Sequence, residues 1–450
     1  MKPNAQTNQH GLSPSEHRRH VHDTAARLSP AQKAGKFWHQ LGPGLTTGAA
    51  DDDPSGIATY SQTGSRYGYQ LLWLAAFTFP FMAIVQEMCA RIGLVTGRGL
   101  AANIRLHFPR WVLYLSTALL FFANTLNIGA DLGAMASAMK LITPQLGFGA
   151  LLIALTIVSL LLQLFLSYAR YARILKWLSL VLLAYVFAAL TLRDINWAEV
   201  LRGMFIPSIS FSREQFILLC GILGTTISPY LFFWQTSQEV EEEILEGKTS
   251  VRARRAEVNA RHIHDMRTDV WTGMLFSNLV MFFIILTCGA VLYAAGTTNI
   301  TSAAEAAEAL RPLAGSGATL LFAVGVVGIG LLAVPVLAGS AAYAITESFR
   351  WKEGLYRKLK DAYAFYGVIA LSTIAGLGLH FFGLNPIKAL ILAAVANGLV
   401  APIILILIVR LASNKSVMGK FQNAPAVRIL GWTITGVMIV VAVAAIVSVV

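Results

Sequence analysis

Cysteine and charged residues are both scarce in this 450-residue chain. Its three cysteines, Cys89, Cys220 and Cys288, all lie in apolar runs and form no CxxC pair, which excludes a disulfide framework and a thiolate metal site. Charged residues make up 13% of the chain and hydrophobic residues 56%, with a mean hydropathy of +0.62. Because soluble domains carry about 25% charged residues, this composition predicts a polytopic membrane protein embedded in a lipid bilayer.

Several functional signatures are also missing. There is no HExxH motif and no Ser–His pairing at membrane depth, so we do not expect an enzyme. The glycines at 325–330 lack the preceding strand of a dinucleotide loop, and no cofactor is expected. The net charge of +12 does not indicate a nucleic-acid partner, because the basic residues are scattered among short loops. Residues 1–36 lack the apolar core of a signal peptide and are predicted to form a disordered cytoplasmic tail.

Eleven apolar runs are long enough to cross a bilayer, which takes about 20 residues. They lie near residues 41–63, 71–94, 111–139, 147–168, 177–192, 214–237, 270–295, 317–345, 361–382, 388–411 and 427–450. With a cytoplasmic N-terminus, only seven of the 35 basic residues fall outside: Arg66, Lys140, Arg193, Arg202, Arg213, Arg311 and Lys388. This asymmetry predicts that orientation and an external C-terminus.

The first apolar run contains an unusual acidic stretch. Three consecutive aspartates, Asp51, Asp52 and Asp53, are followed by Pro54 and by Gly56. A carboxylate at the bilayer centre costs about 3 kcal/mol on insertion scales and marks an ion or substrate path by default. Pro54 has no N–H, so the helix is predicted to break around Asp53 and to leave backbone carbonyls free. A carboxylate beside free carbonyls is typical of a cation site in a secondary transporter.

The sixth apolar run is interrupted in the same way, by Gly221, Gly224, Thr225, Thr226 and Pro229. The two interrupted runs are five apart, so two five-helix halves would have opposite orientations. We therefore expect an all-α protein with a 5+5 inverted repeat, broken first and sixth helices and one extra helix. The expected boundaries are one transporter domain at 37–450, with repeats at about 41–192 and 214–411 and the extra helix at about 427–450.

An acidic run follows the sixth apolar run, and it comprises Glu239, Glu241, Glu242 and Glu243. Blocks of like charge are usually solvated. We expect a solvated helix end here; the alternative is a group that attracts cations at the inner mouth.

An ordered series of motifs, from about Gly42 to the last span, resembles the NRAMP divalent-metal transporters. The matching stretches are GPG at 42–44, DPSG at 53–56, YGYQLLW at 67–73, QEMCARIGLVTGRGLA at 86–101, ADLGAMASA at 130–138, GTTISP at 224–229 and VMGKFQN at 417–423. The resemblance implies alternating access in a bacterial inner membrane, with a divalent metal ion as substrate rather than cofactor. It leaves the oligomeric state open.

The resemblance also implies which residues bind the ion. Asp53 would supply a carboxylate, and Ala50 and Thr225 would supply backbone carbonyls at the two breaks. Two ligands of the family are replaced: Gly56 stands where the family has asparagine, and Ser228 stands where it has methionine. Ser228 could offer a hydroxyl oxygen, or it could instead bond back to its own helix.

These replacements favour Mg²⁺ as the substrate. Thioether sulfur suits softer transition metals, whereas oxygen ligands suit Mg²⁺, Ca²⁺ and Mn²⁺. Mg²⁺ keeps several of its waters and needs a roomy site with few direct ligands. The chain is therefore similar to the magnesium-transporting branch related to NRAMP, with Mn²⁺ as a second possible ion.

Proton coupling is not expected. The transition-metal members have a histidine after the sixth-span proline, where this chain has Tyr230, and a Glu three residues after the third-span Asp, where Asp131 is followed by Ala134. Tyrosine has a reference pKa of about 10 and cannot titrate near neutrality as histidine does. The alternative is a proton-coupled Mn²⁺/Fe²⁺ importer. A cation channel is less favoured, because no filter-like loop is present.

Each of the other polar residues inside the predicted spans has two possible roles. Asp51 and Asp52 could join the site through water, or could cap a helix or face an outer vestibule. Glu87 and Asp131 could be vestibule ligands or ion-pair partners, and Arg91, one helical turn after Glu87, favours an ion pair there. The amides of Asn124, Asn127 and Asn397 are expected to form interhelical hydrogen bonds rather than to touch hydration water.

Overall fold

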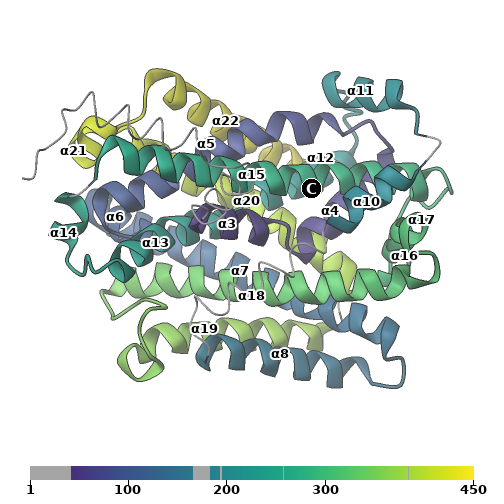
Figure 1. Cartoon of the computed structure of the whole chain (residues 1–450), viewed down its shortest axis with the longest axis horizontal. Helices are drawn as coiled ribbons and strands as arrows, with labels where there is room; N and C mark the ends of the chain where they lie inside the picture. The colour runs from purple at the N-terminus through teal and green to yellow at the C-terminus, as the bar shows by residue number, and fades with distance from the viewer. Residues whose placement is uncertain (1–41, 166–182, 193–194, 257, 384, 450) are drawn as a thin grey trace, which may run out of the picture. The chain divides into compact units, whose positions relative to one another are not determined.

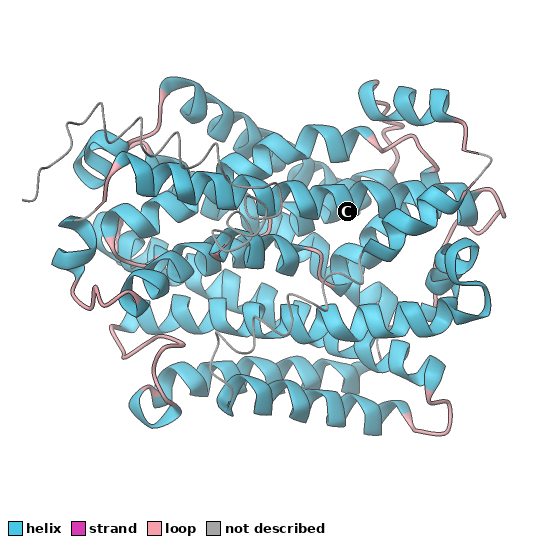
Figure 2. Ribbon diagram, in the orientation of Figure 1, coloured by secondary structure: helices cyan, strands magenta, loops and turns pink. Residues whose placement is uncertain are grey.

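The computed structural model describes residues 42–165, 183–192, 195–256, 258–383 and 385–449, and their regular structure is entirely helical, with no strand among them (Figures 1 and 2). The predicted tail, residues 1–36, lies outside these ranges. The longer helices are α5 (Trp73–Thr96), α7 (Arg110–Ile142), α8 (Phe148–Phe165), α13 (Pro229–Leu245), α15 (Ala260–Cys288), α18 (Ala318–Phe349), α19 (Tyr363–Gly378), α20 (Pro386–Ala412) and α22 (Pro425–Val449). The shorter ones are α3 (Pro43–Asp51), α4 (Pro54–Tyr67), α6 (Leu100–His107), α10 (Leu183–Thr191), α11 (Trp197–Phe205), α12 (Arg213–Thr226), α14 (Val251–Ala256), α16 (Ala303–Ala307), α17 (Arg311–Ala314) and α21 (Lys415–Met418).

Nine helical stretches in the described ranges are long and apolar enough to cross a membrane. They coincide with nine of the eleven predicted runs. Of the other two, the first is divided between α3 and α4, and the fifth is described only from residue 183, as α10. The prediction of many apolar helices is confirmed, and the count of eleven stays a prediction.

Both predicted helix breaks are present. α3 ends at Asp51 and α4 begins at Pro54, with Asp53 between them in an extended conformation (φ −63°, ψ 170°). α12 ends at Thr226 and α13 begins at Pro229, preceded by Ser228, which is also extended (φ −80°, ψ 131°). Each proline starts a helix, because its missing N–H is one that the first turn leaves unpaired anyway. Local proline chemistry therefore sets both breaks.

Glycines bring α3 into backbone contact with α15. A Cβ atom on Gly48 would overlap the carbonyl group of Gly273, and a Cβ atom on Gly273 would overlap the carbonyl group of Gly44. Such close approach of backbones through small residues is typical of helix packing in membranes. It fixes the position of the short helix that leads to the first break.

Gly48→Ala is expected to destabilise the fold by about 1 to 3 kcal/mol, the usual cost of overpacking a tight interface. Gly436→Ala on α22 is the matched control, because no atom lies within 4 Å of a Cβ placed there. Thermal unfolding of the two detergent-solubilised variants provides the comparison. Equal unfolding temperatures for both would contradict the close packing of α3 on α15.

α7 and α18 run side by side (Figure 1) and are joined by a buried amide. Asn124 Nδ2 donates to the carbonyl of Leu337 (2.8 Å) and to Ser340 Oγ (2.7 Å). The expectation of an interhelical hydrogen bond at Asn124 is confirmed. Because α7 also carries Asn127 and Asp131, this contact helps to fix the rotation of the helix that faces the first break.

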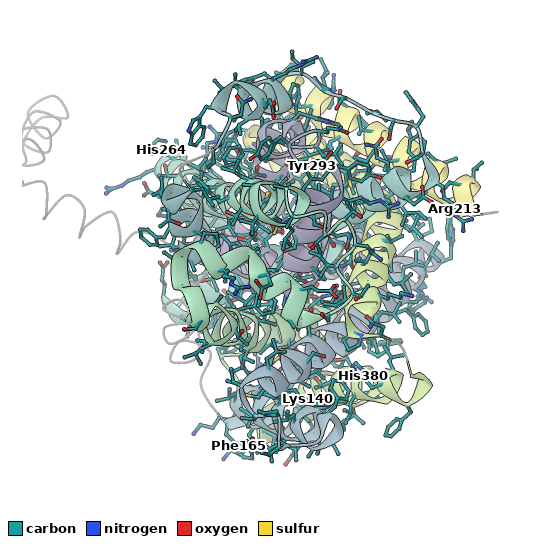
Figure 3. All side chains as sticks on the ribbon, turned by 90° about the vertical axis from the view of Figure 1, so that its right-hand side faces the viewer. Lys140, Phe165, Arg213, His264, Tyr293 and His380 are labelled. Atoms are coloured by element: carbon teal, nitrogen blue, oxygen red, sulfur yellow. The ribbon has the colours of Figure 1, made fainter. Side chains whose placement is uncertain are left out.

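α8 and α22 are among the helices that present large apolar side chains on the surface. Phe165 at the end of α8 is 73% exposed and points outward at the edge of the molecule (Figure 3). Other exposed apolar side chains on α8 and α22 are Ile153, Ile157, Val158, Leu161, Ile429, Val440, Val443, Ile446 and Val447. Extended apolar faces of this kind are rare on soluble monomers and fit contact with lipid chains. The chain is an integral membrane protein.

Candidate ion site

The two helix breaks face each other and are joined by hydrogen bonds. Tyr60 Oη on α4 lies 3.3 Å from Thr226 Oγ1 at the end of α12. Tyr230 Oη on α13 donates to the carbonyl of Ala50 on α3 (3.1 Å). A Cβ atom on Gly56 would lie 3.1 Å from Thr225 Oγ1. Gly56 therefore lies directly against the second break.

Asp53 lies between these breaks with no exposed surface. Its Oδ1 caps α4 by accepting from the backbone N–H of Gly56 (2.7 Å) and from Ser55 Oγ (2.6 Å). Its Oδ2 accepts from Asn127 Nδ2 (2.8 Å) and from Tyr230 Oη (3.4 Å). These four donors are neutral, so they orient the carboxylate without cancelling its charge.

Asp51 and Asp52 are also buried, at 0% and 2% exposure, and both lie against Ser277 on α15. Ser277 Oγ donates to Asp51 Oδ2 (2.7 Å) and lies 3.4 Å from Asp52 Oδ1. Asp51 Oδ1 has no hydrogen-bond partner in the described part of the chain. Neither carboxylate faces an open vestibule in this conformation.

Asp131 on α7 belongs to the same cluster. Asn127 Nδ2, one helical turn earlier, lies 3.1 Å from Asp131 Oδ2, and Asn397 Nδ2 on α20 donates to Asn127 Oδ1 (3.1 Å). Among the described residues no ion pair includes Asp131, so this structure offers no support for an ion-pair role. Asn127 and Asn397 do form interhelical hydrogen bonds, as predicted, and these bonds lie beside Asp53 and Asp131 at the candidate site.

Three residues of the candidate site, Asn127, Asn397 and Ser277, were not predicted as site residues. Asn127 and Asn397 were expected to form interhelical hydrogen bonds rather than to touch hydration water, although the position of Asn127 one turn before Asp131 places it beside that acid. Ser277 carried no sequence signal, because a single serine in an apolar helix is common and usually bonds to its own helix.

Glu87 lies in an ion-pair cluster instead. Its carboxylate is 3.6 Å from Arg91 Nη1 and 2.8 Å from Arg267 Nη2, and it accepts from Trp271 Nε1 (2.9 Å). The expected ion pair with Arg91 is confirmed. Two arginines and an indole N–H thus already neutralise and orient the Glu87 carboxylate, which argues against a ligand role.

The backbone carbonyls expected as ligands each accept one hydrogen bond. Ser228 Oγ donates to the carbonyls of Thr225 (2.6 Å) and Gly224 (2.9 Å), and Tyr230 Oη donates to that of Ala50. Ser228 thus bonds back to its own helix, which was the alternative interpretation. Because a carbonyl oxygen has two lone pairs, Ala50 and Thr225 each keep one for an ion.

Four buried aspartates form this cluster, and no basic side chain among the described residues forms an ion pair with them. Asp51, Asp52, Asp53 and Asp131 are at most 2% exposed, and none of them takes part in an ion pair within the described ranges. Buried carboxylates without counter-charges are strongly disfavoured, so a cation fits this place. No three His, Cys, Asp or Glu side chains of the described chain converge as in a fully dehydrated metal site. An ion here would take its ligands from carboxylate, carbonyl, amide and water oxygens.

The acidic run at the C-terminal end of α13 does not match its prediction. Glu239, Glu241 and Glu243 are only 4–6% exposed, and Glu242 alone is exposed. Glu241 accepts from Tyr343 Oη (2.6 Å) and from the backbone N–H groups of Leu355 (2.8 Å) and Tyr356 (3.0 Å). The expectation of a solvated helix end was therefore wrong for three of the four glutamates, because tertiary contacts cover them.

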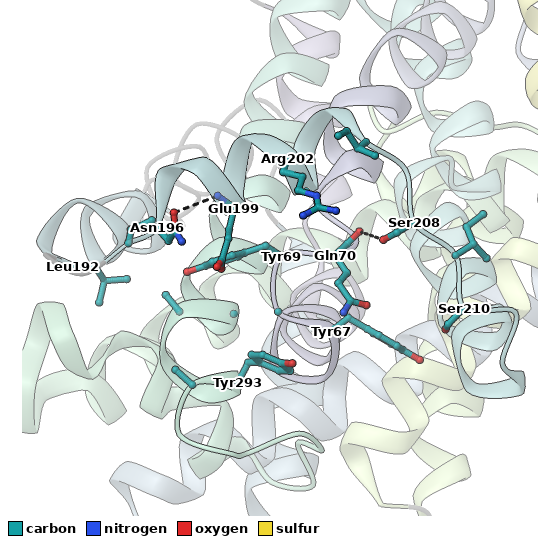
Figure 4. Close-up of a pocket in the computed structure, with 18 residues that line it drawn as sticks. Tyr67, Tyr69, Gln70, Leu192, Asn196, Glu199, Arg202, Ser208, Ser210 and Tyr293 are labelled. Atoms are coloured by element: carbon teal, nitrogen blue, oxygen red, sulfur yellow. Dashed lines mark hydrogen bonds between the residues drawn. The ribbon is translucent and has the colours of Figure 1, made fainter.

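A cavity of about 880 Å³ lies away from this site (Figure 4). It is bordered by the end of α4, by α11 and by Tyr293, and Tyr69, Glu199 and Arg202 are among its lining residues. The lining of this cavity does not include Ala50, Asp53 or Thr225. A much smaller cavity of about 20 Å³, next to Pro54, is lined mainly by apolar side chains. The aspartates are thus enclosed by protein in this conformation.

Comparison with known proteins agrees with the site. The sequence profile of the Nramp family, described as natural resistance-associated macrophage protein-like, matches residues 44–448. The chain is 25% identical to the divalent metal cation transporter MntH of Klebsiella pneumoniae (strain 342), over 89% of this chain and 91% of that protein. It is 26% identical to the divalent metal cation transporter MntH of Aeromonas hydrophila subsp. hydrophila, over 92% of this chain and 96% of that protein.

Solved structures show the fold. A crystal structure of the Eremococcus coleocola manganese transporter superposes with a TM-score of 0.69 at 16% identity, covering 94% of this chain and 88% of that one. Mhp1, a nucleobase-cation-symport-1 family transporter, superposes with a TM-score of 0.54 at 15% identity, covering 91% of each chain. The profile match spans nearly the whole described chain. The protein therefore belongs to the Nramp family, whose members are divalent metal cation transporters and not enzymes.

Proposed function

We propose that this protein carries Mg²⁺ into the cell by alternating access, without coupling to protons, and that Mn²⁺ is a second substrate. The observation that carries the proposal is the group of four buried aspartates beside the two facing breaks, which has no counter-charge among the described residues. We infer that Asp53 and the carbonyls of Ala50 and Thr225 contact the ion. Asp51, Asp52, Asp131 and Ser228 would then act through water.

The selectivity for Mg²⁺ follows from what is missing at the breaks. Gly56 contributes no side-chain ligand where it faces Thr225 Oγ1, and Ser228 offers oxygen in place of sulfur. The ligands that remain are all oxygens, which suit a hard ion. Having fewer protein ligands leaves more of the coordination sphere to water, and Mg²⁺ gives up its hydration shell reluctantly.

The absence of proton coupling follows from Tyr230. Its phenol donates to Ala50 and Asp53, where a histidine of the transition-metal members would stand. With a reference pKa of about 10, the phenol keeps its proton throughout the cycle, and Ala134 offers no carboxylate to pass one on.

The architecture we infer is the eleven-helix arrangement predicted from the sequence. α3 with α4, and α12 with α13, would be the corresponding broken helices of two inverted repeats, and α22 the extra helix. The basic residues favour a cytoplasmic N-terminus, an external C-terminus and a bacterial inner membrane.

The second candidate is a proton-coupled Mn²⁺ or Fe²⁺ importer. It is favoured by the Eremococcus coleocola relative, which is a manganese transporter. Gly56, Ser228 and Tyr230 argue against it, since each replaces a group that the transition-metal members use.

Uptake into proteoliposomes that contain an interior pH dye separates the candidates. Mg²⁺, Mn²⁺ and Fe²⁺ are supplied in separate runs under an inside-negative potential. We expect saturable entry of Mg²⁺ without acidification of the lumen. Entry of Mn²⁺ with acidification, and no entry of Mg²⁺, would contradict the proposal and support the second candidate.

A further inference from the structure

The inner half of α13 is polar and yet buried. Gln235, Gln238 and Glu239 are 0%, 3% and 6% exposed. Ser228, which precedes this helix at the break, lies seven residues before Gln235 and therefore on nearly the same side of it. The strip formed by Gln235, Gln238 and Glu239 thus begins near the ion site and leads along α13 towards Leu245.

Glu239 has no positive partner in the described part of the chain. Its Oε1 accepts from Gln235 Nε2 (2.8 Å), and the charged groups that act on it most strongly are the acids Glu242, Asp269 and Glu243. A charged carboxylate buried among other acids is destabilising, and a bound cation would relieve this cost. The site at the breaks has the same combination of burial and missing counter-charge.

An independent observation points to a ligand. Gln235 Oε1 has no hydrogen-bond partner within the described ranges, although the residue has no exposed surface. Because its amide nitrogen is held by Glu239, the free oxygen is fixed beside that carboxylate. A buried acceptor without a donor is costly, and an ion or its water would satisfy it.

Gln86 on α5 lies between the two places. Thr236 Oγ1 donates to the carbonyl of Cys89 (3.1 Å), and a Cβ atom on Gly93 would lie 3.2 Å from Glu239 Cβ, so α5 and α13 run parallel here. Gln86 is seven residues before Gly93, on the same side of α5 and closer to the break. It is 1% exposed, and neither atom of its amide has a hydrogen-bond partner among the described residues.

We propose a second divalent-cation site on the inner half of α13, formed by the Glu239 carboxylate and Gln235 Oε1 and completed by water. It lies about 15 Å along the helix from Pro229, at a rise of 1.5 Å per residue. A hydrated ion released from Asp53 passes Gln86 and binds at this second site before it reaches the inner mouth. The order of these steps rests on the proposed function; binding at the second site does not.

Equilibrium dialysis of the full chain in detergent against MgCl₂, with bound metal measured by mass spectrometry, tests the proposal. The wild type is expected to approach two Mg²⁺ per chain, and Glu239→Gln and Asp53→Asn one each. Glu246→Gln is the matched control on the same helix end, because its carboxylate is 63% exposed, and it should keep both ions.

The outcomes separate the two proposals. If Asp53→Asn loses one ion while Glu239→Gln binds as the wild type does, the second site is wrong and the first stands. If only Glu239→Gln loses an ion, the proposed function of the Asp53 site fails. Gln235→Leu is the second variant in case Glu239→Gln unfolds; it keeps the carboxylate, removes the free oxygen and should also lose one ion.

Transport gives a further readout. In proteoliposomes Glu239→Gln should lower the maximal rate of Mg²⁺ uptake about tenfold and leave the KM for external Mg²⁺ unchanged, because the entry site is intact. An increased KM with an unchanged maximal rate would overturn the position we assign to this site on the path. If Glu239 binds only water, Glu239→Gln will have the maximal rate, the KM and the number of bound Mg²⁺ ions of the wild type. That result would also overturn the proposal.

Discussion

Asp53→Asn is expected to lower the initial rate of Mg²⁺ uptake at least about 100-fold without unfolding the protein. Loss of a group that merely supports a metal site costs about 10- to 100-fold, and Asp53 would supply the charge itself. Asparagine keeps an oxygen for the N–H of Gly56 and the hydroxyl of Ser55, and it is as good a helix N-cap as aspartate. Uptake into proteoliposomes and thermal unfolding measure the two effects separately.

Asp53→Ala is the companion variant. It removes the charge and the cap together, so it should abolish uptake and also cost about 1 kcal/mol of stability. Uptake by Asp53→Asn above a tenth of the wild-type rate would mean that the carboxylate charge does not hold the ion.

The double variant Gly56→Asn with Ser228→Met is expected to raise the ratio of Mn²⁺ to Mg²⁺ uptake rates at least about tenfold, equivalent to about 1.4 kcal/mol. It restores the amide oxygen and the thioether sulfur of the transition-metal members, and sulfur favours softer ions. An asparagine Cβ would lie 3.1 Å from Thr225 Oγ1. That hydroxyl oxygen has no hydrogen-bond partner in the described chain, so it can move aside at little cost.

Three controls belong to this experiment. The two single variants show which ligand changes the ratio, and adding Asp53→Asn to the double variant should abolish the acquired Mn²⁺ uptake. If the double variant transports Mg²⁺ and Mn²⁺ in the wild-type ratio, then Gly56 and Ser228 do not determine selectivity.

Local chemistry made the helix breaks predictable. Pro54 and Pro229 each lack an N–H, and the residues before them, Asp53 and Ser228, are extended as residues before proline tend to be. The ion pair of Glu87 with Arg91 was predictable for the same reason, because both residues lie on one helix one turn apart.

Contacts between distant segments could not be predicted in this way. Ser277 reaches Asp51 across 226 positions, and Asn127 reaches Asp53 across 74. These contacts depend on the rotation of α15 and α7 about their own axes, which the apolar pattern of a helix buried on several sides does not determine.

The acidic run shows how tertiary contacts override a local expectation. Glutamates at a helix end are usually solvated, but Glu241 binds Tyr343 and two backbone N–H groups more than a hundred positions away. Glu239, about 200° away from Glu241 around the helix, packs instead against Gly93 of α5 and lies beside Gln235.

The central claim is that an all-oxygen, partly hydrated site between the two breaks carries Mg²⁺ and does not prefer the softer Mn²⁺. The most direct test is competition: initial Mg²⁺ uptake by wild-type proteoliposomes, with and without an equal concentration of Mn²⁺ outside. We predict that Mg²⁺ still enters at no less than about half its rate without Mn²⁺, as expected when two ions bind one site with similar affinity. Near-complete block of Mg²⁺ entry by Mn²⁺ would contradict the account, because it would show a site that strongly prefers the softer ion.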